Sequence, residues 1–247
     1  MTGELGKRFA ELTKELGKRF QEQTNLREEI VQQNLALMSE KLEFVRSEIL
    51  YEIRYGENGN APSVNSEMET KEPRILQPTK FEEFKTNGLR LNLGCGKVAL
   101  AGYINVDQRD VSGVDILADV GNLSLPEGSV REIFSAHLLE HFPNEQLRRR
   151  LLPYWFRLLS PHGLFRAIVP DGDAMLISVG AGEYSFEDFR EVLFGGQEYG
   201  ENYNYNLFTP ASLRKLLEEA GFTEITIPVR GRHNGNFFEF EVRARRP

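Results

Sequence analysis

Two glycines and an aspartate are the residues whose types and spacing point most clearly to chemistry. Gly94 and Gly96 follow an apolar run that ends at Leu93, and Asp107 ends the next apolar run. A Gly-x-Gly turn after a strand lets the backbone approach a ligand where a β-carbon would collide with it. A carboxylate at the end of the neighbouring strand can accept hydrogen bonds from both hydroxyls of a ribose. We therefore expect a ribose-containing ligand at these residues.

The residues around this trio narrow the kind of ligand. Asp119 follows the third apolar run and is placed to take the exocyclic amine of an adenine, with Val120 beside the ring. Asp107 comes thirteen residues after Gly94, whereas a nicotinamide site has its acidic residue about twenty residues on. This spacing disfavours a nicotinamide cofactor. Cys95 is interpreted as a small side chain in a tight loop, because no partner base for a nucleophile is evident nearby.

Three residues are candidates for catalytic acid–base work. His137 falls at the end of the fourth expected strand, where an imidazole titrating near neutrality can take a proton from a hydroxyl. An equal alternative is that His137 only hydrogen-bonds a ligand carboxylate or the backbone. Asp171 ends the fifth strand and is the second candidate base, although capping the helix that follows is the favoured role. His141 is the third candidate and is expected mainly to brace its loop.

The elements that must position these residues alternate between strands and helices. The stretch 144–160 is expected to be a helix, and Thr209 and Pro210 open another helix that Gly221 ends. Such alternation implies a mostly parallel sheet covered on both faces, and the last two strands suggest an antiparallel edge. The expected strands are Leu89–Leu93, Tyr103–Val106, Val114–Ala118, Glu132–Ala136, Leu164–Val169, Glu224–Val229 and Phe237–Arg243.

The N-terminal part of the chain differs from the rest. Residues 1–55 lack proline and carry apolar side chains in steps of three and four, and Glu4–Phe9 recurs as Glu15–Phe20, an eleven-residue repeat. One helix cannot bury so narrow a stripe, so we expect it to meet copies of itself or another protein, as in a coiled coil; packing along its own globular domain is the alternative. Residues 56–86 have the composition of a flexible linker, and 87–247 form the globular domain.

Composition excludes several classes of function. A net charge of −7 argues against a nucleic-acid binder, which needs a basic face to neutralise phosphates. A single cysteine rules out an internal disulfide and a multi-cysteine zinc site. No apolar run reaches membrane-spanning length, and the N-terminus lacks the apolar core of a signal peptide. We therefore expect a cytoplasmic protein with no membrane span and no nucleic-acid partner.

Four stretches of the globular domain resemble the class I S-adenosylmethionine-dependent methyltransferases, particularly small bacterial members associated with surface-glycan synthesis. They span most of residues 89–171 in the family's order. The chain departs from the family pattern in lacking the third glycine of the common motif, and in having His162 where glycine is usual. The stretches are Leu91–Gly96 with Gly102–Asp107, Asp115–Val120 with Leu125 and Pro126, Ser135–Phe142, and Trp155–Gly163 with Val169–Asp171.

The resemblance implies an α/β fold with a Rossmann-like, seven-stranded, mostly parallel sheet and an antiparallel edge, preceded by the N-terminal helix. It also implies an enzyme that transfers a methyl group from S-adenosylmethionine to an oxygen of a sugar in a cell-surface glycan or its precursor. A small-molecule or lipid-intermediate acceptor, and a non-catalytic scaffold, are the alternatives. The residues expected to bind the cofactor are Leu93, Gly94, Cys95, Gly96, Asp107, Gln108, Asp119, Val120 and His137.

The sequence also contains candidate residues for a metal site and for an acceptor site. His137, Glu140 and His141 have a spacing similar to the metal sites of some O-methyltransferases, because residues at i, i+3 and i+4 share a helical face. The same sequence occurs in metal-free relatives, and we expect no metal. Tyrosines and amides in 195–206 suit stacking on a polyhydroxylated ring, or form an ordinary aromatic lid. The cluster Arg230–His233 could meet an anionic group, or be a solvated hairpin.

Overall fold

The computed structural model describes residues 2–55, 72–195 and 203–247. The chain divides into two units, Met1–Glu67 and Met68–Pro247. In the part of the chain that the structure describes, no helix is both long and apolar enough to cross a membrane.

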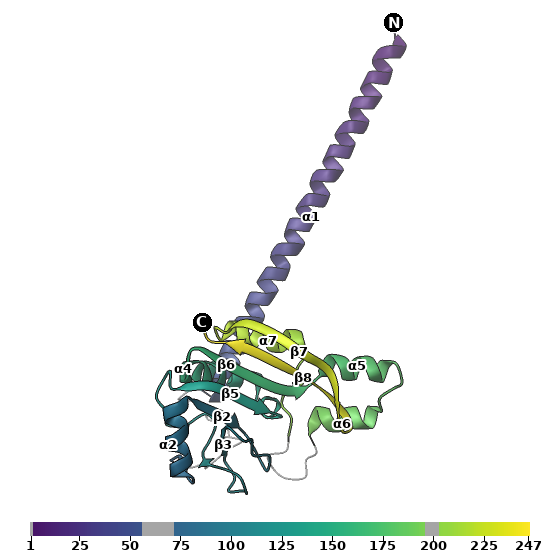
Figure 1. The fold of residues 1–247 in the computed structure, drawn as a ribbon. Coiled ribbons are helices and arrows are strands. Elements are labelled where there is room, and N and C mark those ends of the chain that lie inside the picture. The colour runs from purple at the N-terminus through teal and green to yellow at the C-terminus, as the bar shows by residue number, and fades with distance from the viewer. Residues whose placement is uncertain (1, 56–71, 196–202) are drawn as a thin grey trace. The chain divides into compact units, whose positions relative to one another are not determined.

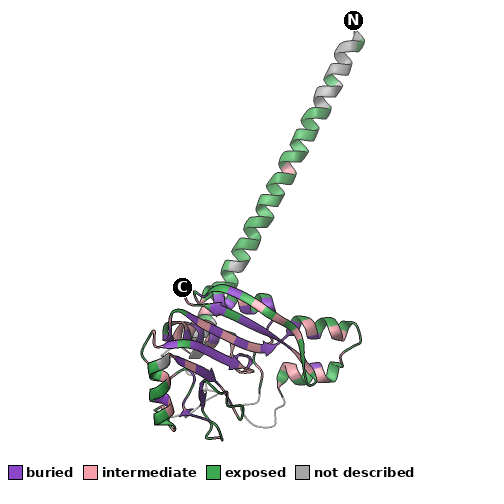
Figure 2. Cartoon of the chain, viewed as in Figure 1, coloured by how far each residue is buried: buried purple, intermediate pink, exposed green. Residues whose placement is uncertain are grey.

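The first unit contains one helix, α1, from Thr2 to Tyr55. Its 54 residues contain no proline, so no backbone N–H of the helical ladder is lost. Large apolar side chains between Leu16 and Ile49 lie exposed along it (Figure 2). The helix expected for residues 1–55 is therefore present, and a row of its apolar side chains is exposed to solvent.

The second unit is built on a sheet of eight strands in the order β1-β4-β3-β2-β5-β6-β8-β7 (Figure 1). The strands from β4 across to β6 pair in parallel, whereas β8 pairs antiparallel with both β6 and β7. This confirms the expected α/β fold with a mostly parallel sheet and an antiparallel edge. The sheet has eight strands rather than the expected seven, because β1 pairs antiparallel with β4 in a stretch that was expected to be a linker. The strands are β1 Arg74–Ile75, β2 Leu89–Leu93, β3 Ile104–Asp107, β4 Ile116–Leu117, β5 Val130–Ala136, β6 Leu159–Pro170, β7 Thr223–Asn234 and β8 Phe237–Arg245.

Helices pack against this sheet and extend from the end of β6. The expected helix 144–160 is broken into an α-turn, a π-turn and a second α-segment, because Pro153 cannot donate a backbone hydrogen bond within it. The predicted cap of the last helix is confirmed: Thr209 accepts a hydrogen bond from the N–H of Ser212. The helices are α2 Pro78–Asn87, η1 Leu139–His141, α3 Asn144–Gln146, η2 Leu147–Leu151, α4 Leu152–Leu158, α5 Gly172–Gly180, α6 Phe186–Phe194 and α7 Pro210–Glu219.

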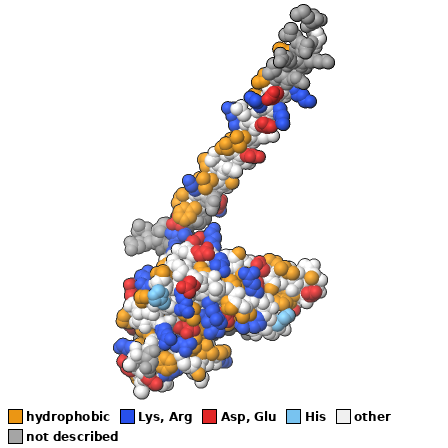
Figure 3. Space-filling model, turned by 45° about the horizontal axis from the view of Figure 1, so that its top comes forward, with side chains coloured by type: hydrophobic (Ala, Val, Ile, Leu, Met, Phe, Trp, Pro, Cys, Tyr) orange, Lys and Arg blue, Asp and Glu red, His pale blue; other side chains and the backbone are white. Residues whose placement is uncertain are grey.

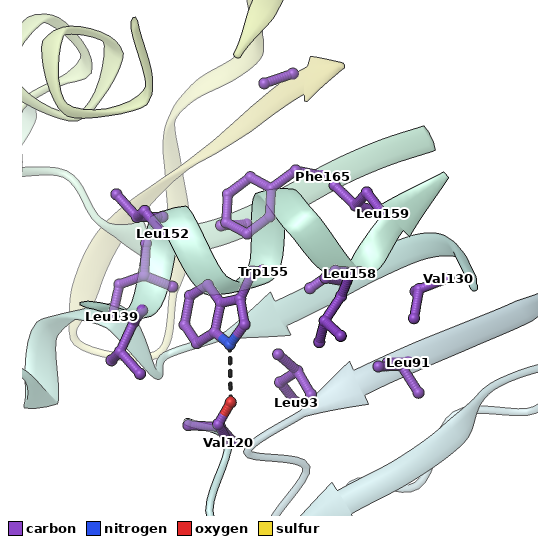
Figure 4. Packing of buried hydrophobic residues seen from close by; sticks show 14 of the residues in the cluster. Leu91, Leu93, Val120, Val130, Leu139, Leu152, Trp155, Leu158, Leu159 and Phe165 are labelled. Atoms are coloured by element: carbon purple, nitrogen blue, oxygen red, sulfur yellow. Dashed lines mark hydrogen bonds between the residues drawn. The ribbon is translucent and has the colours of Figure 1, made fainter. Parts of the chain in front are cut away.

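An apolar core joins the sheet to α4 and α7. Trp155 is fully buried and stacks on Phe165 with ring centroids 6.1 Å apart. Its indole Nε1 donates a hydrogen bond of 2.9 Å to the carbonyl of Val120 (Figure 4). This bond satisfies the one polar atom of the indole, and it ties the loop after β4 to the core.

The stretch expected to be a linker carries structure in its last part. β1 and α2 lie at residues 74–87, and Phe81 of α2 is buried in the core. Pro78 starts the helix, a position where its missing N–H costs no hydrogen bond. Lys80 contacts the buried carboxylate of Asp115 at 2.6 Å. Pro78, one of the prolines that suggested a linker, thus starts a helix, and Lys80, one of the polar residues, forms an ion pair.

Candidate functional site

The strand order reverses between β2 and β5. From β2 the chain moves outward through β3 to β4, and β5 then lies on the other side of β2. In open parallel sheets, ligands bind outside the carboxyl ends of the strands where the strand order reverses in this way. The turns that follow β2, β3, β4 and β5 carry the residues singled out in the sequence. The fold therefore brings the sequence candidates to one edge of the sheet.

The turn after β2 uses its glycines for backbone conformation. Gly94 has φ of 63° and Gly96 has φ of 53°, both in the left-handed region that favours glycine. A β-carbon at Gly94 would lie 2.6 Å from Cδ1 of Leu138, so a side chain of the protein already fills that space. Cys95 between them is buried, and burial first, then the nearby carboxylates, raises the pKa of its thiol to about 12. A raised pKa disfavours the thiolate form that a nucleophile needs.

Asp107 lies beside this turn with both carboxylate oxygens engaged. Oδ2 accepts a hydrogen bond of 2.8 Å from the N–H of Gly96, and Oδ1 accepts bonds from the N–H and Nε of Arg109 at 2.9 and 3.1 Å. Burial alone would raise the pKa of this carboxyl, but the hydrogen bonds and charge of Arg109, with the Gly96 N–H, lower it. The structure thus joins Asp107 to the glycine turn.

Arg109 is a residue of this site that the sequence reasoning missed. Its guanidinium lies over the turn, because a β-carbon at Gly96 would be 3.5 Å from Nη2 of Arg109. The side chain is 46% exposed, so it can leave the carboxylate without breaking the core. A basic residue two positions after the strand-ending acid was the available signal.

The remaining expected cofactor-binding residues divide into buried and exposed ones. Leu93 and Val120 are buried in the core, where Val120 offers its carbonyl to Trp155. Gln108 and Asp119 are exposed, and Oδ1 of Asp119 accepts a hydrogen bond of 2.7 Å from the N–H of Gly121. The carboxylate of Asp119 therefore faces the loop after β4 and has lone pairs left for a further donor.

His137, after β5, is held between two buried carboxylates. Its Nδ1 lies 3.2 Å from Oε1 of Glu140, and its Nε2 lies 2.9 Å from Oε2 of Glu239. Ionised carboxylates only accept hydrogen bonds, so this geometry favours a ring with a proton on each nitrogen, the imidazolium. Burial alone lowers the pKa of His137, but Glu140 and then Glu239 raise it above its ordinary value. The backbone of His137 is also unusual, because its φ of 52° lies in the left-handed region.

Glu239 is the second residue that the sequence reasoning missed. It accepts hydrogen bonds from Nε of Arg232 at 2.6 Å and from Nδ2 of Asn234 at 2.8 Å. Burial alone would raise the pKa of the Glu239 carboxyl, but the hydrogen bonds from Asn234, Arg232 and His137 lower it. The available signal was a pair of acids, at 239 and 241, spaced by two in the run Phe237–Val242, which is otherwise apolar.

Glu140 completes the group and has one oxygen without a partner. The residue is 2% exposed, and its Oε2 is buried with no hydrogen-bond partner among the described residues. An unsatisfied buried carboxylate oxygen is costly, which makes this atom a place where a ligand hydroxyl or amine can donate.

The hypothetical metal set does not share a helical face. The helical turn η1 begins at Leu139, and His137 lies before it with a left-handed backbone. His141 turns its Nδ1 to the carbonyl of Tyr203 at 3.0 Å, and so braces the loop as expected. Within residues 2–55, 72–195 and 203–247, no group of three or more His, Cys, Asp or Glu side chains is arranged to hold a metal ion.

Asp171 takes the capping role that was favoured for it. Its Oδ1 accepts a hydrogen bond from the N–H of Ala174 at 3.2 Å, so it caps α5. Its Oδ2 accepts a second bond from the N–H of Gly231 at 2.9 Å, across the sheet. Asp171 is 2% exposed. The residue therefore ties the end of β6 to the β7–β8 hairpin.

The segment proposed to contact an acceptor lies against η1 where it is described. The N–H groups of Tyr205 and Asn206 both donate to the carbonyl of Glu140, at 2.8 and 3.1 Å. The amides of Asn204 and Asn206 hold the segment by donating to the carbonyls of Val192 and Phe142. Tyr203 and Tyr205 stay exposed, at 43% and 52%. Residues 196–202, which include part of the expected loop, lie outside the described residues.

The basic cluster before the last turn has been partly neutralised. Arg232 forms an ion pair with Glu239, and His233 packs on Phe238 with ring centroids 4.2 Å apart. Arg230 is exposed. The cluster is thus in part a structural element of the His137 group.

Similarity to known proteins is found among solved structures. No family model and no curated protein matches it. Among solved structures, it is similar to a SAM-dependent methyltransferase, possible histamine N-methyltransferase, from Thermotoga maritima, with 16% identity, TM-score 0.48, and coverage of 69% of this chain and 96% of that one. A SAM-dependent methyltransferase from Methanosarcina mazei gives 18%, 0.46, 70% and 98%. One from Archaeoglobus fulgidus gives 15%, 0.45, 68% and 90%.

Proposed function

We propose that residues 87–247 are an S-adenosylmethionine-dependent O-methyltransferase that acts on a sugar hydroxyl of a cell-surface glycan or its precursor. One observation carries the cofactor assignment: the buried carboxylate of Asp107 lies 2.8 Å from the N–H of Gly96, at the point where the strand order reverses. This pairs a glycine turn with an acceptor for ribose hydroxyls in the crevice where nucleotide ligands bind.

The residues of the crevice fit such a cofactor. Gly94 and Gly96 give the turn its left-handed backbone, and Asp107 is the acceptor for the ribose hydroxyls. The exposed carboxylate of Asp119 is available to the adenine amine. When bound, S-adenosylmethionine supplies an electrophilic methyl group on a sulfonium. The chain must then align the acceptor oxygen and receive its proton.

His137 and its carboxylates are proposed to do this second task. The buried, unpartnered Oε2 of Glu140 can accept a hydrogen bond from the acceptor hydroxyl. His137 can take the proton only after losing one of its own, because both of its nitrogens donate to carboxylates. We therefore expect turnover to rise with pH through the raised pKa of His137.

The sugar acceptor is supported by the exposed tyrosines beside η1. Tyr203 and Tyr205 present aromatic rings to solvent, while the neighbouring amides fix the backbone that carries them. Rigid aromatic faces with nearby hydrogen-bonding groups suit a polyhydroxylated ring. The same chemistry accommodates a small-molecule hydroxyl acceptor, and the product assay separates the two.

Calorimetric titration with S-adenosylmethionine tests the cofactor assignment. We expect the intact chain to bind it and Asp107→Ala to lose binding with its fold unchanged, as judged by circular dichroism. Asp110→Ala is the matched control, because Asp110 is an exposed acid three positions later that pairs with Arg74 instead. Unchanged affinity in Asp107→Ala would remove the assignment. No binding by the intact chain would instead favour a non-catalytic scaffold.

Mass spectrometry tests the acceptor. The chain is incubated with S-adenosylmethionine and a panel of nucleotide sugars, glycan fragments and simple phenols, and products are sought that gain one methyl group. We expect methylated sugars with the intact chain and none with Asp107→Ala. Methylation confined to the phenols would exclude the sugar as the acceptor and keep the methyltransferase.

A further inference from the structure

α1 carries a regular apolar stripe that is exposed. The stripe positions recur in steps of four, three and four residues, which is eleven residues for three turns, so the stripe runs nearly straight along the helix. In the space-filling view, hydrophobic side chains recur along the helix between charged ones (Figure 3). The described stripe residues in its central and C-terminal parts are between 49% and 73% exposed: Leu16, Phe20, Val31, Met38, Leu42, Val45 and Ile49.

The pattern is apolar at both ends and polar in the middle. In the sequence it runs from Leu5 to Ile53, and its polar positions, Gln23, Arg27 and Asn34, all fall near the midpoint. A second helix of the same kind, aligned antiparallel and midpoint to midpoint, would set the apolar ends of the stripe against each other and Gln23 near Asn34. Of the polar positions, only Arg27 falls opposite an apolar one, Val31. The stripe is therefore complementary to a copy of itself.

The charges of α1 distinguish the two orientations of such a pair. Residues 2–27 hold six basic and four acidic side chains, whereas residues 28–55 hold three basic and six acidic ones. A parallel pair would set the net positive halves side by side and the net negative halves side by side. An antiparallel pair sets each positive half against a negative one, and it also opposes the helix dipoles favourably.

We propose that α1 pairs antiparallel with α1 of a second copy of this chain. The stripe then sets Leu16 opposite Leu42 of the second copy and Phe20 opposite its Met38. The pairing buries apolar side chains that a lone helix would leave in water. Burial of an apolar face is the main source of stability for a long helix. The pairing joins two chains through their N-terminal units and does not depend on the activity of residues 87–247.

The oligomeric state of the full chain is the first test. Analytical ultracentrifugation should give a mass of twice the 28.3 kDa of one chain. Met38→Asp with Leu42→Asp should weaken the dimer at least a hundredfold, because charges replace apolar side chains in the stripe. Gln33→Asp is the matched control on the opposite side of the helix and should leave the dimer intact. A monomeric intact chain, or a dimer indifferent to the stripe variant, overturns the proposal.

Disulfide trapping tests the orientation. The Leu16→Cys and Leu42→Cys variants are prepared separately, and one carries a tag so that the two chains differ in size. They are mixed, allowed to exchange partners and mildly oxidised. We expect a cross-link between the two kinds of chain and none within either preparation alone. The intact chain is the control, because its one cysteine, Cys95, is buried. Cross-links within the Leu16→Cys preparation alone show a parallel pair and overturn the proposal.

Discussion

Oε2 of Glu239 lies 2.9 Å from Nε2 of His137, although the two residues are 102 positions apart in the chain. The contact arises because β8 pairs antiparallel with β6, which sets Glu239 opposite Pro170. His137 is held at the same edge, since its N–H donates to the carbonyl of Ile168 on β6. The sheet register therefore sets a carboxylate beside the histidine proposed to serve the acceptor, and this carboxylate contributes to raising the pKa of the ring.

Removing this carboxylate should lower the pKa of His137. In Glu239→Gln the ring keeps Glu140 but loses one of the two charges that favour its protonated form. We expect a lower pKa than in the intact chain, measured by NMR titration of the ring nitrogens. Glu241→Gln is the matched control, because Glu241 is a buried acid on the same strand that contacts Arg166 and Arg243 instead. An unchanged pKa in Glu239→Gln would contradict the assignment of the ring as an imidazolium held by both acids.

The stability of the globular unit should fall as the pH rises through the pKa of His137. A histidine whose pKa is raised by folding contributes stability that is complete below its unfolded pKa and is lost above its folded pKa. Each unit of elevation corresponds to about 1.4 kcal/mol of unfolding free energy. Urea unfolding followed by the fluorescence of the single tryptophan, from pH 6 to pH 9, measures this slope. His137→Asn should flatten it, and an equal slope in that variant would assign the effect to another group.

Arg109 should compete with the cofactor for Asp107. Its backbone N–H and Nε both donate to Oδ1, an oxygen that the ribose hydroxyls require in the proposed site. We expect Arg109→Ala to bind S-adenosylmethionine several-fold more tightly, because one charge-assisted hydrogen bond need no longer be broken. Arg109→Lys keeps a charge without the planar fork and should fall between the two. Weaker binding by Arg109→Ala, measured by calorimetry, would show instead that the guanidinium helps to hold the cofactor.

Gly94→Ala should destabilise the globular unit more than a matched glycine change. Gly94 and Gly128 have φ of 63° and 71°, so alanine is strained at both. A β-carbon at Gly94 also meets Leu138 at 2.6 Å, whereas one at Gly128 meets nothing within 4 Å. We expect about 1 kcal/mol of lost unfolding free energy for Gly128→Ala and about 2–4 kcal/mol for Gly94→Ala. Equal losses in urea unfolding would mean that Leu138 moves aside without cost.

Parts of the site that depend on neighbouring residues could be predicted from the sequence. The expected strand Leu89–Leu93 is β2 with the same bounds, and Asp107 ends β3 as expected. An apolar run, a glycine turn and a capping threonine act within a few residues of themselves. The folded chain therefore shows at these residues the local structure that the sequence pattern predicts.

The parts that depend on distant residues were missed or changed. The helical face expected for His137, Glu140 and His141 is missing, because His137 keeps an extended-chain contact with β6 and a left-handed backbone. Residues of the expected linker form β1 and α2 instead, because Phe81 packs in the core and Lys80 forms an ion pair with Asp115. A composition argument cannot see a partner that lies tens of residues away.

The sequence by itself determined the long helix, the run of strands, and the glycines and acid that follow them, because local backbone preference and apolar periodicity suffice for these. Only the tertiary structure decided that His137 lies between two carboxylates, that Asp171 caps α5 and binds Gly231, and that Arg109 lies on Asp107. The physical reason is that the charge state of a buried group is set by what surrounds it. Those surroundings are assembled by sheet register from segments that are remote in the chain.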